Sequence, residues 1–248
     1  MQIDWTLIAY VAVVFAVAGW IKGVIGLGLP TIATGMLGML VAPVQAASIV
    51  VLPALLTNVW QMLYGPGFLK LLRRLWPMLA CVIATTVATA GVVAKADVRL
   101  TVGLLGVALM AYALHALIGT SFKVGARWEK AIGALAGLAT GIISGTTGVF
   151  VVPTVPFLQA IGLGKDELVQ AIGITAFTSA FALALGLGVH GALHAEAGIP
   201  AIVAVVAALG GMALGQVVRS GLDVETFRRW VLIGLLGLGA SMAGRGLM

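Results

Sequence analysis

The stretch GWIKGVIGLGLPTIATGML, residues 19–37, has a near copy in GIISGTTGVFVVPTVPFLQ, residues 141–159. Each copy lies in an apolar segment of membrane length and interrupts it with glycine, proline and small hydroxyl residues. Paired interrupted helices in the two halves of a membrane chain indicate a transport site at the interruptions. The matching pairs are Gly19 and Gly141, Gly23 and Gly145, Gly26 and Gly148, and, after one inserted residue, Pro30 and Pro153.

The composition excludes an ordinary soluble domain. Of the 248 residues, 61% are hydrophobic and 9% are charged, and the mean hydropathy is +1.16. A soluble domain carries about 25% charged residues, so the outside of this chain must face lipid. Leu, Ala and Gly dominate and no alternation is visible, which favours helices over a barrel. The predicted fold class is therefore all-α, a polytopic membrane protein of eight to ten helical segments.

Two segments are too long for one membrane crossing and barely long enough for two. These are residues 5–42 and 131–163, the segments that contain the repeated stretch. All the other crossings are uninterrupted apolar runs of ordinary length. These runs are predicted at residues 44–64, 75–94, 100–118, 168–189, 199–218 and 230–247.

The distribution of basic residues decides between one and two crossings. With one crossing per long segment, Lys and Arg divide almost evenly between the two sides of the membrane, which orients nothing. With two crossings per long segment, one side of the membrane carries only Lys95, Arg99 and Arg245, and all the other loop cations lie on the opposite side. Because cytoplasmic loops are rich in Lys and Arg, that opposite side is predicted to be cytoplasmic. The residues that then share the cytoplasmic side are Lys70, Arg73, Arg74, Lys123, Arg127, Lys130, Lys165, Arg219, Arg228 and Arg229.

Ten segments make two repeats of five, residues 1–125 and 126–248, within one integral membrane domain. An odd number of crossings per repeat means that the repeats insert in opposite orientations, a common plan among secondary transporters. Both termini are then extracytoplasmic. The short arms at residues 31–42 and 154–163 either cross fully or re-enter, and the sequence leaves this open.

The repeated glycine motif followed by proline, in a chain of this length, resembles the TauE/SafE family, also called the sulfite exporter family. The resemblance covers residues 7–242 and rests on residues 23–28 with Pro30 and residues 145–148 with Pro153. The segment LPALLTNVWQ, residues 52–61, and its weaker counterpart GITAFTSAF, residues 173–181, add to it. The resemblance implies movement of small sulfur-containing or organic anions across the bacterial cytoplasmic membrane.

The two interruptions are the predicted anion site. Glycine permits backbone conformations that other residues avoid, and the second arm of a broken helix begins with unpaired N–H groups that attract anions. Proline suits the first turn of such an arm. The alternative for these glycines is close helix packing. The predicted substrate-binding residues at the interruptions are Gly26, Gly28, Pro30, Thr31, Gly148, Pro153 and Thr154.

Polar side chains within the uninterrupted spans extend this site. A buried amide costs free energy unless it has a partner, so Thr57, Asn58 and Gln61 are predicted to bind either substrate or the backbone of a broken helix. In the second half, Thr175, Thr178 and Ser179 form the matching stripe. Their alternative is bonding between helices or to their own backbone.

Lys22 and three hydroxyl residues lie within the repeated stretch itself. Ser144, Thr146 and Thr147 offer neutral hydroxyls to an oxyanion, and Lys22 occupies the position of Ser144 in the first copy. An ionisable residue inside a membrane segment is a functional candidate by default. The alternative for Lys22 is that its long side chain reaches the cytoplasmic interface.

The remaining motifs predict no enzyme and no cofactor. There is no Walker A sequence and no GxSxG sequence, and one cysteine, Cys81, excludes a cysteine metal cluster. His190, His194 and Glu196 could hold zinc, but without a complete motif they are interpreted as a polar external loop.

The predicted function is therefore a secondary transporter or facilitator for a small anion: sulfite, thiosulfate, an organosulfonate or a small organic acid. Its partners are the anion, membrane lipid and, in a coupled mechanism, an ion; the basic residues indicate membrane topology and not nucleic-acid binding. Two rivals stay open: an anion channel with the interruptions as its constriction, and a membrane sulfur-transfer partner that uses Cys81.

Overall fold

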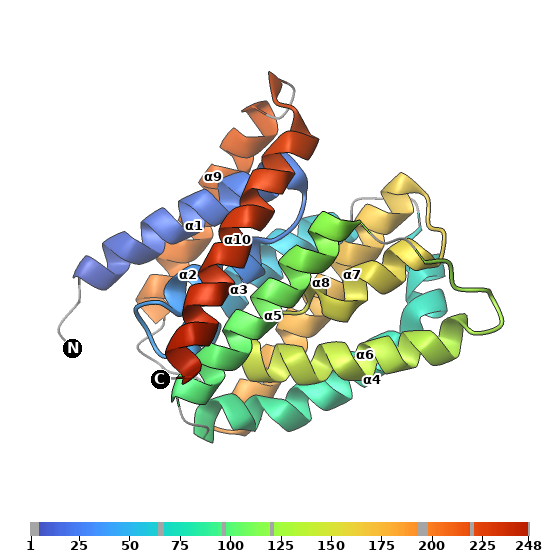
Figure 1. Cartoon of the computed structure of the whole chain (residues 1–248), viewed down its shortest axis with the longest axis horizontal. Helices are drawn as coiled ribbons and strands as arrows, with labels where there is room; N and C mark the ends of the chain where they lie inside the picture. The colour runs from blue at the N-terminus through green and yellow to red at the C-terminus, as the bar shows by residue number, and fades with distance from the viewer. Residues whose placement is uncertain are drawn as a thin grey trace.

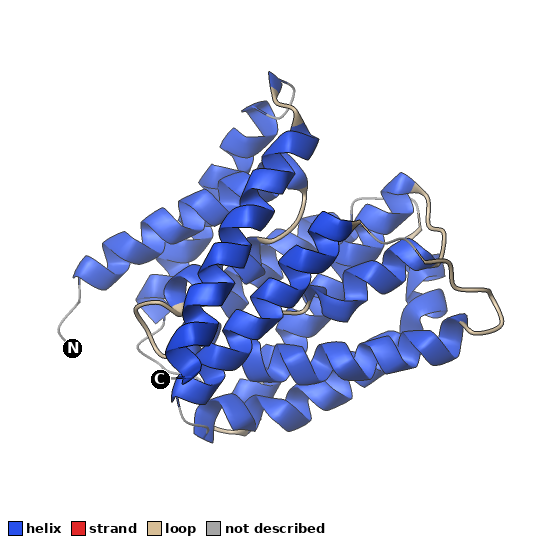
Figure 2. Cartoon of the chain, viewed as in Figure 1, coloured by secondary structure: helices blue, strands red, loops and turns tan. Residues whose placement is uncertain are grey.

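The structure, a computed structural model, describes residues 5–63, 67–95, 98–119, 122–192, 198–218 and 221–247. These residues form helices and connecting turns without any strand, so the all-α prediction is confirmed (Figures 1 and 2). The helices are α1 (Trp5–Ile25), α2 (Leu29–Leu37), α3 (Pro43–Leu63), α4 (Phe68–Lys95), α5 (Val98–Ile118), α6 (Glu129–Thr147), α7 (Val151–Ala160), α8 (Lys165–Val189), α9 (Gly198–Val218) and α10 (Val224–Leu247).

Several helices begin earlier than the apolar runs predicted. α4 starts at Phe68 and α10 at Val224, so Lys70, Arg74 and Arg228 lie on helices and not in loops. The reason is that backbone hydrogen bonding continues past the apolar segment, while long basic side chains still reach water.

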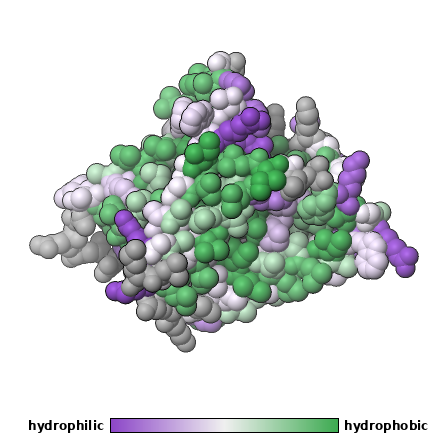
Figure 3. All heavy atoms as spheres, in the orientation of Figure 1, coloured by the Kyte–Doolittle hydropathy of each residue, from purple (hydrophilic) through white to green (hydrophobic). Residues whose placement is uncertain are grey.

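Six of the helices are long and apolar enough to cross a membrane. They are α1, α3, α4, α5, α8 and α9. Apolar side chains also cover much of the visible surface, and hydrophilic residues gather toward its edges (Figure 3). A surface of this kind is suited to lipid.

Glycines allow the closest approach between paired helices. A Cβ at Gly19 would collide with the carbonyl oxygen of Ala208, and one at Gly211 with that of Ala16, so α1 and α9 pack in parallel at short range. Gly137 and Gly145 of α6 meet α4 in the same way. Small residues allow this close backbone approach in membrane bundles.

The extensive helix contacts follow a pattern of exchange between the two halves. The first helix of each half packs on the fourth helix of the other: α1 on α9, and α6 on α4. The third helices, α3 and α8, pack on each other, as do the fifth, α5 and α10. Both of these last pairs are antiparallel, since Gln61 lies near Gly173 and Gly103 near Gly246.

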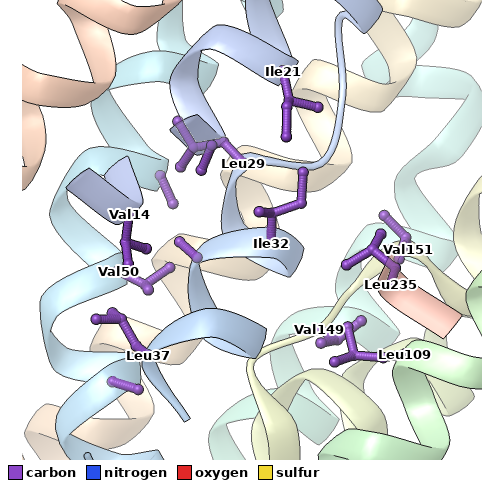
Figure 4. Packing of buried hydrophobic residues seen from close by; sticks show 14 of the residues in the cluster. Val14, Ile21, Leu29, Ile32, Leu37, Val50, Leu109, Val149, Val151 and Leu235 are labelled. Carbon is purple, nitrogen blue, oxygen red and sulfur yellow. The ribbon is translucent and has the colours of Figure 1, made fainter. Parts of the chain in front are cut away.

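The two short helices lie in the protein interior. Almost every residue of α2 is buried, including Leu29 and Ile32. Figure 4 shows these two side chains in the same apolar cluster as Val149, in the second break, and Val151, the first residue of α7. Non-helical backbone at membrane depth is tolerated where it is buried in protein, and the core here supplies that cover.

The basic residues concentrate at one end of the molecule. We call it the basic end: α1, α3, α5, α7 and α9 finish there, and α4, α6, α8 and α10 begin there. Arg74 ties three of these helix ends together, because it binds Glu129 at 2.6 Å and the carbonyl oxygen of Ile161 at 3.0 Å. Besides Lys22 near the end of α1, the described basic residues at this end are Lys70, Arg73, Arg74, Lys123, Arg127, Lys130, Lys165, Arg228 and Arg229; Lys95, Arg99 and Arg245 lie at the other.

Candidate functional site

The first break separates α1 from α2 at the basic end. Gly26 and Gly28 have φ angles of +87° and +96°, a region that side chains rarely adopt. The N–H of Gly26 still donates to the carbonyl of Lys22 at 2.7 Å, and that of Ile32 donates to Gly28 at 2.8 Å. No side chain caps α2, and Pro30 stands in its first turn. The amides ahead of Ile32 therefore lack acceptors within α2 and give its N-terminus a partial positive charge.

The second break also turns at a positive-φ glycine, but it has a single such residue, a non-helical Val152 within α7, and more internal hydrogen bonds. Gly148 has φ +75°, and its N–H donates to the carbonyl of Ser144 at 2.8 Å. The next amide, that of Val149, donates to the hydroxyl of Thr147 at 3.2 Å. The hydroxyl of Thr154 pairs with Thr140 at 2.7 Å. Several of the polar groups predicted to meet an anion here already bind each other.

Lys22 lies inside the protein, although it is near the end of α1. Only 5% of the residue is exposed. Its Nζ donates to Thr57 Oγ1 at 3.1 Å and to Asn58 Oδ1 at 2.5 Å, and both partners come from α3. Among the described residues no carboxylate forms an ion pair with it. A buried cation that has only neutral partners leaves its charge uncompensated.

A cavity of about 330 Å³ adjoins Lys22 at the basic end. Gly23 and Gly26 line it from α1, and Gln61 and Gln216 add amide groups from α3 and α9. The amide of Gln61 also donates to the carbonyl of Val169 at 3.1 Å, which holds α3 to α8. We call this space the Lys22 cavity; its other lining residues are Thr57, Trp60, Val169 and Met212.

Several buried polar atoms in the described part of the chain have no hydrogen-bond partner. The amide nitrogen of Asn58 is one, although the oxygen of the same side chain accepts from Lys22. The hydroxyls of Thr31 and Thr34 on α2 and of Ser179 on α8 are others. A Cβ on Gly148 would lie 3.5 Å from the Thr34 side chain, which places one of these hydroxyls beside the second break. Unpaired buried groups of this kind call for a ligand or a functional explanation.

The remaining hydroxyl residues bond to their own helices. Thr146 and Thr147 donate to Ile142 and Ile143, while Thr175 and Thr178 donate to the carbonyl oxygens four residues earlier. For Thr175 and Thr178 this is the alternative that the sequence left open; for Thr146 and Thr147 the sequence analysis named only the anion. The hydroxyl protons of these residues are therefore already used in hydrogen bonds and are not free to donate to an anion.

The two breaks do not lie face to face. Gly148 adjoins Thr34, in the second half of α2. Leu27, in the first break, lines a cavity with Val155 and Pro156 of α7. Each break therefore lies beside the short helix of the other half. Of the predicted site residues, Gly26, Thr57, Asn58 and Gln61 lie around Lys22, whereas Ser144 and Thr147 lie at Gly148.

The sequence reasoning missed part of the Lys22 cavity. Gln216 is an amide within a charge-free apolar run, which is the same signal that selected Asn58, and it was overlooked. Trp60 and Met212 carried no signal beyond their apolar character. His190 bonds the carbonyl of Val87 at 3.2 Å, whereas His194 and Glu196 lie outside the described residues.

Comparison with known proteins agrees with this architecture. Residues 11–242 match the family model described as sulfite exporter TauE/SafE. Searches of the curated proteins and of the solved structures found no match. The match covers nearly the whole chain and includes both breaks and all the residues around Lys22. The chain, a multi-pass membrane protein, therefore belongs to the TauE/SafE sulfite exporter family of membrane transporters.

Proposed function

We propose that this chain is a secondary carrier or facilitator that moves a small anion across the bacterial cytoplasmic membrane, and that the anion binds at Lys22. The observation that carries the proposal is a buried ammonium next to a cavity, to which no carboxylate of the described residues is paired. Taking an ion out of water costs several kcal/mol. A bound anion offsets that cost at Lys22, and the ammonium lowers the same cost for the anion.

The hydrogen-bonding groups around Lys22 support this role. An ammonium has three N–H donors, and two of them point to Thr57 and Asn58. The amide nitrogen of Asn58 is a further buried donor without a partner. Two donors are thus available to an oxyanion such as sulfite, thiosulfate, an organosulfonate or a carboxylate. Neutral groups elsewhere in the site suit an ion that must also leave.

The second break contributes the other part of the proposed path. Gly148 and Thr147 lie beside Thr34, whose hydroxyl is buried and unpaired. Ser179, also unpaired, comes from the neighbouring α8. We assign these groups to transient contacts with the anion as it moves away from Lys22 toward the other end of the molecule.

Substitution of Lys22 tests the function. Lys22→Met removes the charge at similar length, so transport and binding of labelled sulfite or thiosulfate in liposomes should fall at least tenfold. Thermal stability should be unchanged or higher, because replacing an uncompensated buried charge by an apolar group is neutral or stabilising. Lys22→Arg should retain part of the activity. Lys130→Met, at an exposed position of the same end, is the control.

Normal transport by Lys22→Met would refute the assignment. Saturable flux that accelerates with counter-substrate distinguishes a carrier from a channel. Cys81 lies against Gly137 of α6, a packing position, so Cys81→Ser should leave transport intact, whereas a sulfur-transfer role requires the thiol.

The proposed orientation places the basic end in the cytoplasm and both termini outside it. It follows from the excess of Lys and Arg at that end. Single cysteines in a Cys81→Ser background can be labelled from outside intact cells. A cysteine at Gly125 or Leu222 should stay unlabelled, and one at Met39, at the opposite end, should react. The reverse pattern would invert the topology.

A further inference from the structure

We propose that a second anion-binding site lies at the basic end, on the other side of the first break from Lys22, with Arg228 as its principal ligand. It takes a small oxoanion, including one that carries a short apolar group. The site does not depend on Lys22, because it stands on a separate cavity and on residues from other helices.

The cavity lies between the end of α5, the end of α7 and the start of α10. Its volume is about 380 Å³, within the range of about 300–1,000 Å³ usual for small-molecule sites. Arg228, Arg229 and Glu225 line it from α10, while His115 and Gln159 add further polar groups from α5 and α7. We call this cavity the vestibule.

The guanidinium groups of the vestibule are weakly paired. Arg228 lies 3.7 Å and Arg229 3.6 Å from the oxygens of Glu225. Charge-assisted hydrogen bonds are shorter, about 2.7–2.9 Å. The carboxylate of Glu225 is also 62% exposed, so water screens it. Two cations and one loosely held carboxylate leave net positive charge in the cavity.

Arg228 is the better ligand of the two cations. Its side chain is 32% exposed, against 68% for Arg229, so its charge is less screened by water. A guanidinium also matches an oxoanion with two parallel N–H donors. Leu27, Val155 and Leu232 form an apolar wall of the same cavity, which suits the apolar part of an organic anion.

The inner end of the vestibule is closed in this structure. Arg228 and Tyr112 also line a small inner cavity that reaches Gly28 and Ile32 at the start of α2. That inner space is about 10 Å³, no more than one water molecule needs. The remaining side chains around it are apolar. An anion at Arg228 is therefore held outside an apolar constriction, with the N-terminus of α2 beyond it.

Charge-selective modification of a cysteine tests the site without measuring transport. The full-length Cys81→Ser protein, purified in detergent, receives Gln159→Cys within the vestibule. We compare its rates with an anionic reagent, sulfonatoethyl methanethiosulfonate, and with the cationic trimethylammonium analogue. Arg228→Gln should lower the anionic-to-cationic rate ratio at least about fivefold, since one unit charge at close range is worth about 1 kcal/mol even in water.

Matched variants separate the vestibule from the basic surface in general. Arg73→Gln, an exposed residue of the same end that does not line the vestibule, should leave the ratio unchanged. Ala126→Cys, exposed in the loop before α6, should respond little to Arg228→Gln. An equal effect of Arg73→Gln, or no effect of Arg228→Gln, would overturn the proposal. Lys22→Met should not alter the ratio, so this result stands or falls separately from the carrier mechanism.

Protection by sulfate identifies the ligand. Millimolar sulfate should slow modification of Gln159→Cys more than chloride of the same ionic strength, and the difference should vanish in Arg228→Gln. A lipid phosphate has similar chemistry, so the experiment is repeated in nanodiscs of neutral and of anionic lipid. Protection by anionic lipid alone, without sulfate, would show that the cavity takes a headgroup and would refute a site for soluble anions.

Discussion

The first and second breaks share a backbone design and differ in their surroundings. Both end a long helix on a glycine with positive φ and start a short buried helix. Beside the first break are Lys22 and an open cavity of about 330 Å³. Beside the second, Ser144 takes the place of Lys22, and Leu183 and Leu187 pack with Ala47 and Ala90 in a closed apolar cluster.

This difference separates what the repeat determines from what single residues determine. The glycine pattern places a positive-φ residue at the end of α1 and again at the end of α6, a torsion angle that glycine adopts without strain. Electrostatic character is determined by one position, where an ammonium in the first half replaces a hydroxyl in the second. In the carrier proposed above, the charged region beside the first break holds the anion, and the neutral region beside the second break lets it leave.

The largest expected loss of stability concerns a feature that the two halves share, the close glycine contacts of their first helices. Gly19→Leu and Gly141→Leu should each destabilise the protein by about 3 kcal/mol, at the upper end of the usual cost of overpacking, because each added side chain meets neighbouring atoms at less than 3 Å. Gly19 meets the backbone of α9, and Gly141 meets Thr85 and the carbonyl of Val82 on α4. Thermal denaturation in detergent measures both.

Gly210→Leu is the matched control for these variants, because no atom lies within 4 Å of the added Cβ position. It should fold normally. If either Gly19→Leu or Gly141→Leu were as stable as the control, the two halves would not be held together by equivalent glycine contacts.

The next effect tests the breaks themselves. Gly26→Leu and Gly148→Leu both force a side chain into a positive-φ conformation, which costs about 1–3 kcal/mol. Gly148 is enclosed by Thr34 and Leu183, whereas Gly26 has open space around it. Gly148→Leu should therefore destabilise the protein more than Gly26→Leu does. Gly26→Leu should fold and fill the Lys22 cavity, so it should lose anion binding.

Binding of labelled sulfite in detergent, measured beside thermal stability, distinguishes the two variants. Equal stability losses would mean that the surroundings of the breaks are equivalent after all.

The smallest effect compares matched polar positions of the third helices. Asn58→Ala removes one of the two acceptors of the Lys22 ammonium and should destabilise the protein or weaken anion binding by about 1–3 kcal/mol. Ser179→Ala removes a buried hydroxyl without a partner, so stability should be unchanged or slightly higher. A stability loss in Ser179→Ala as large as that in Asn58→Ala would remove the proposed asymmetry.

The sequence predicted the helices well, because long apolar runs and the hydrogen-bonding demands of lipid leave few alternatives. α5, for example, differs from its predicted span by two residues at one end. It also selected Lys22, Thr57 and Asn58, which the structure brings together. Intramembrane polar residues are rare enough to stand out.

Local sequence could not give the partners of these groups. The pairing of Thr154 with Thr140 and the closeness of Thr34 to Gly148 depend on how helices cross, which apolar patterns do not encode. The vestibule was missed for the same reason. Arg228 resembles any basic residue at a helix start until α5 and α7 are placed around it.

The pairing of α1 with α9 bears on biosynthesis. α4 and α6 are close in the chain and can pair soon after both have been made, but α1 is followed by more than 170 residues before Gly198 begins its partner. During translation, the glycine face of α1 therefore remains without its α9 partner until α9 has been synthesised. Contacts between distant segments form late because closing the intervening loop costs entropy. The Lys22 cavity, which needs both α1 and α9, is thus among the last parts of the protein to be completed, and a ribosome stalled before α9 leaves a chain with no finished site.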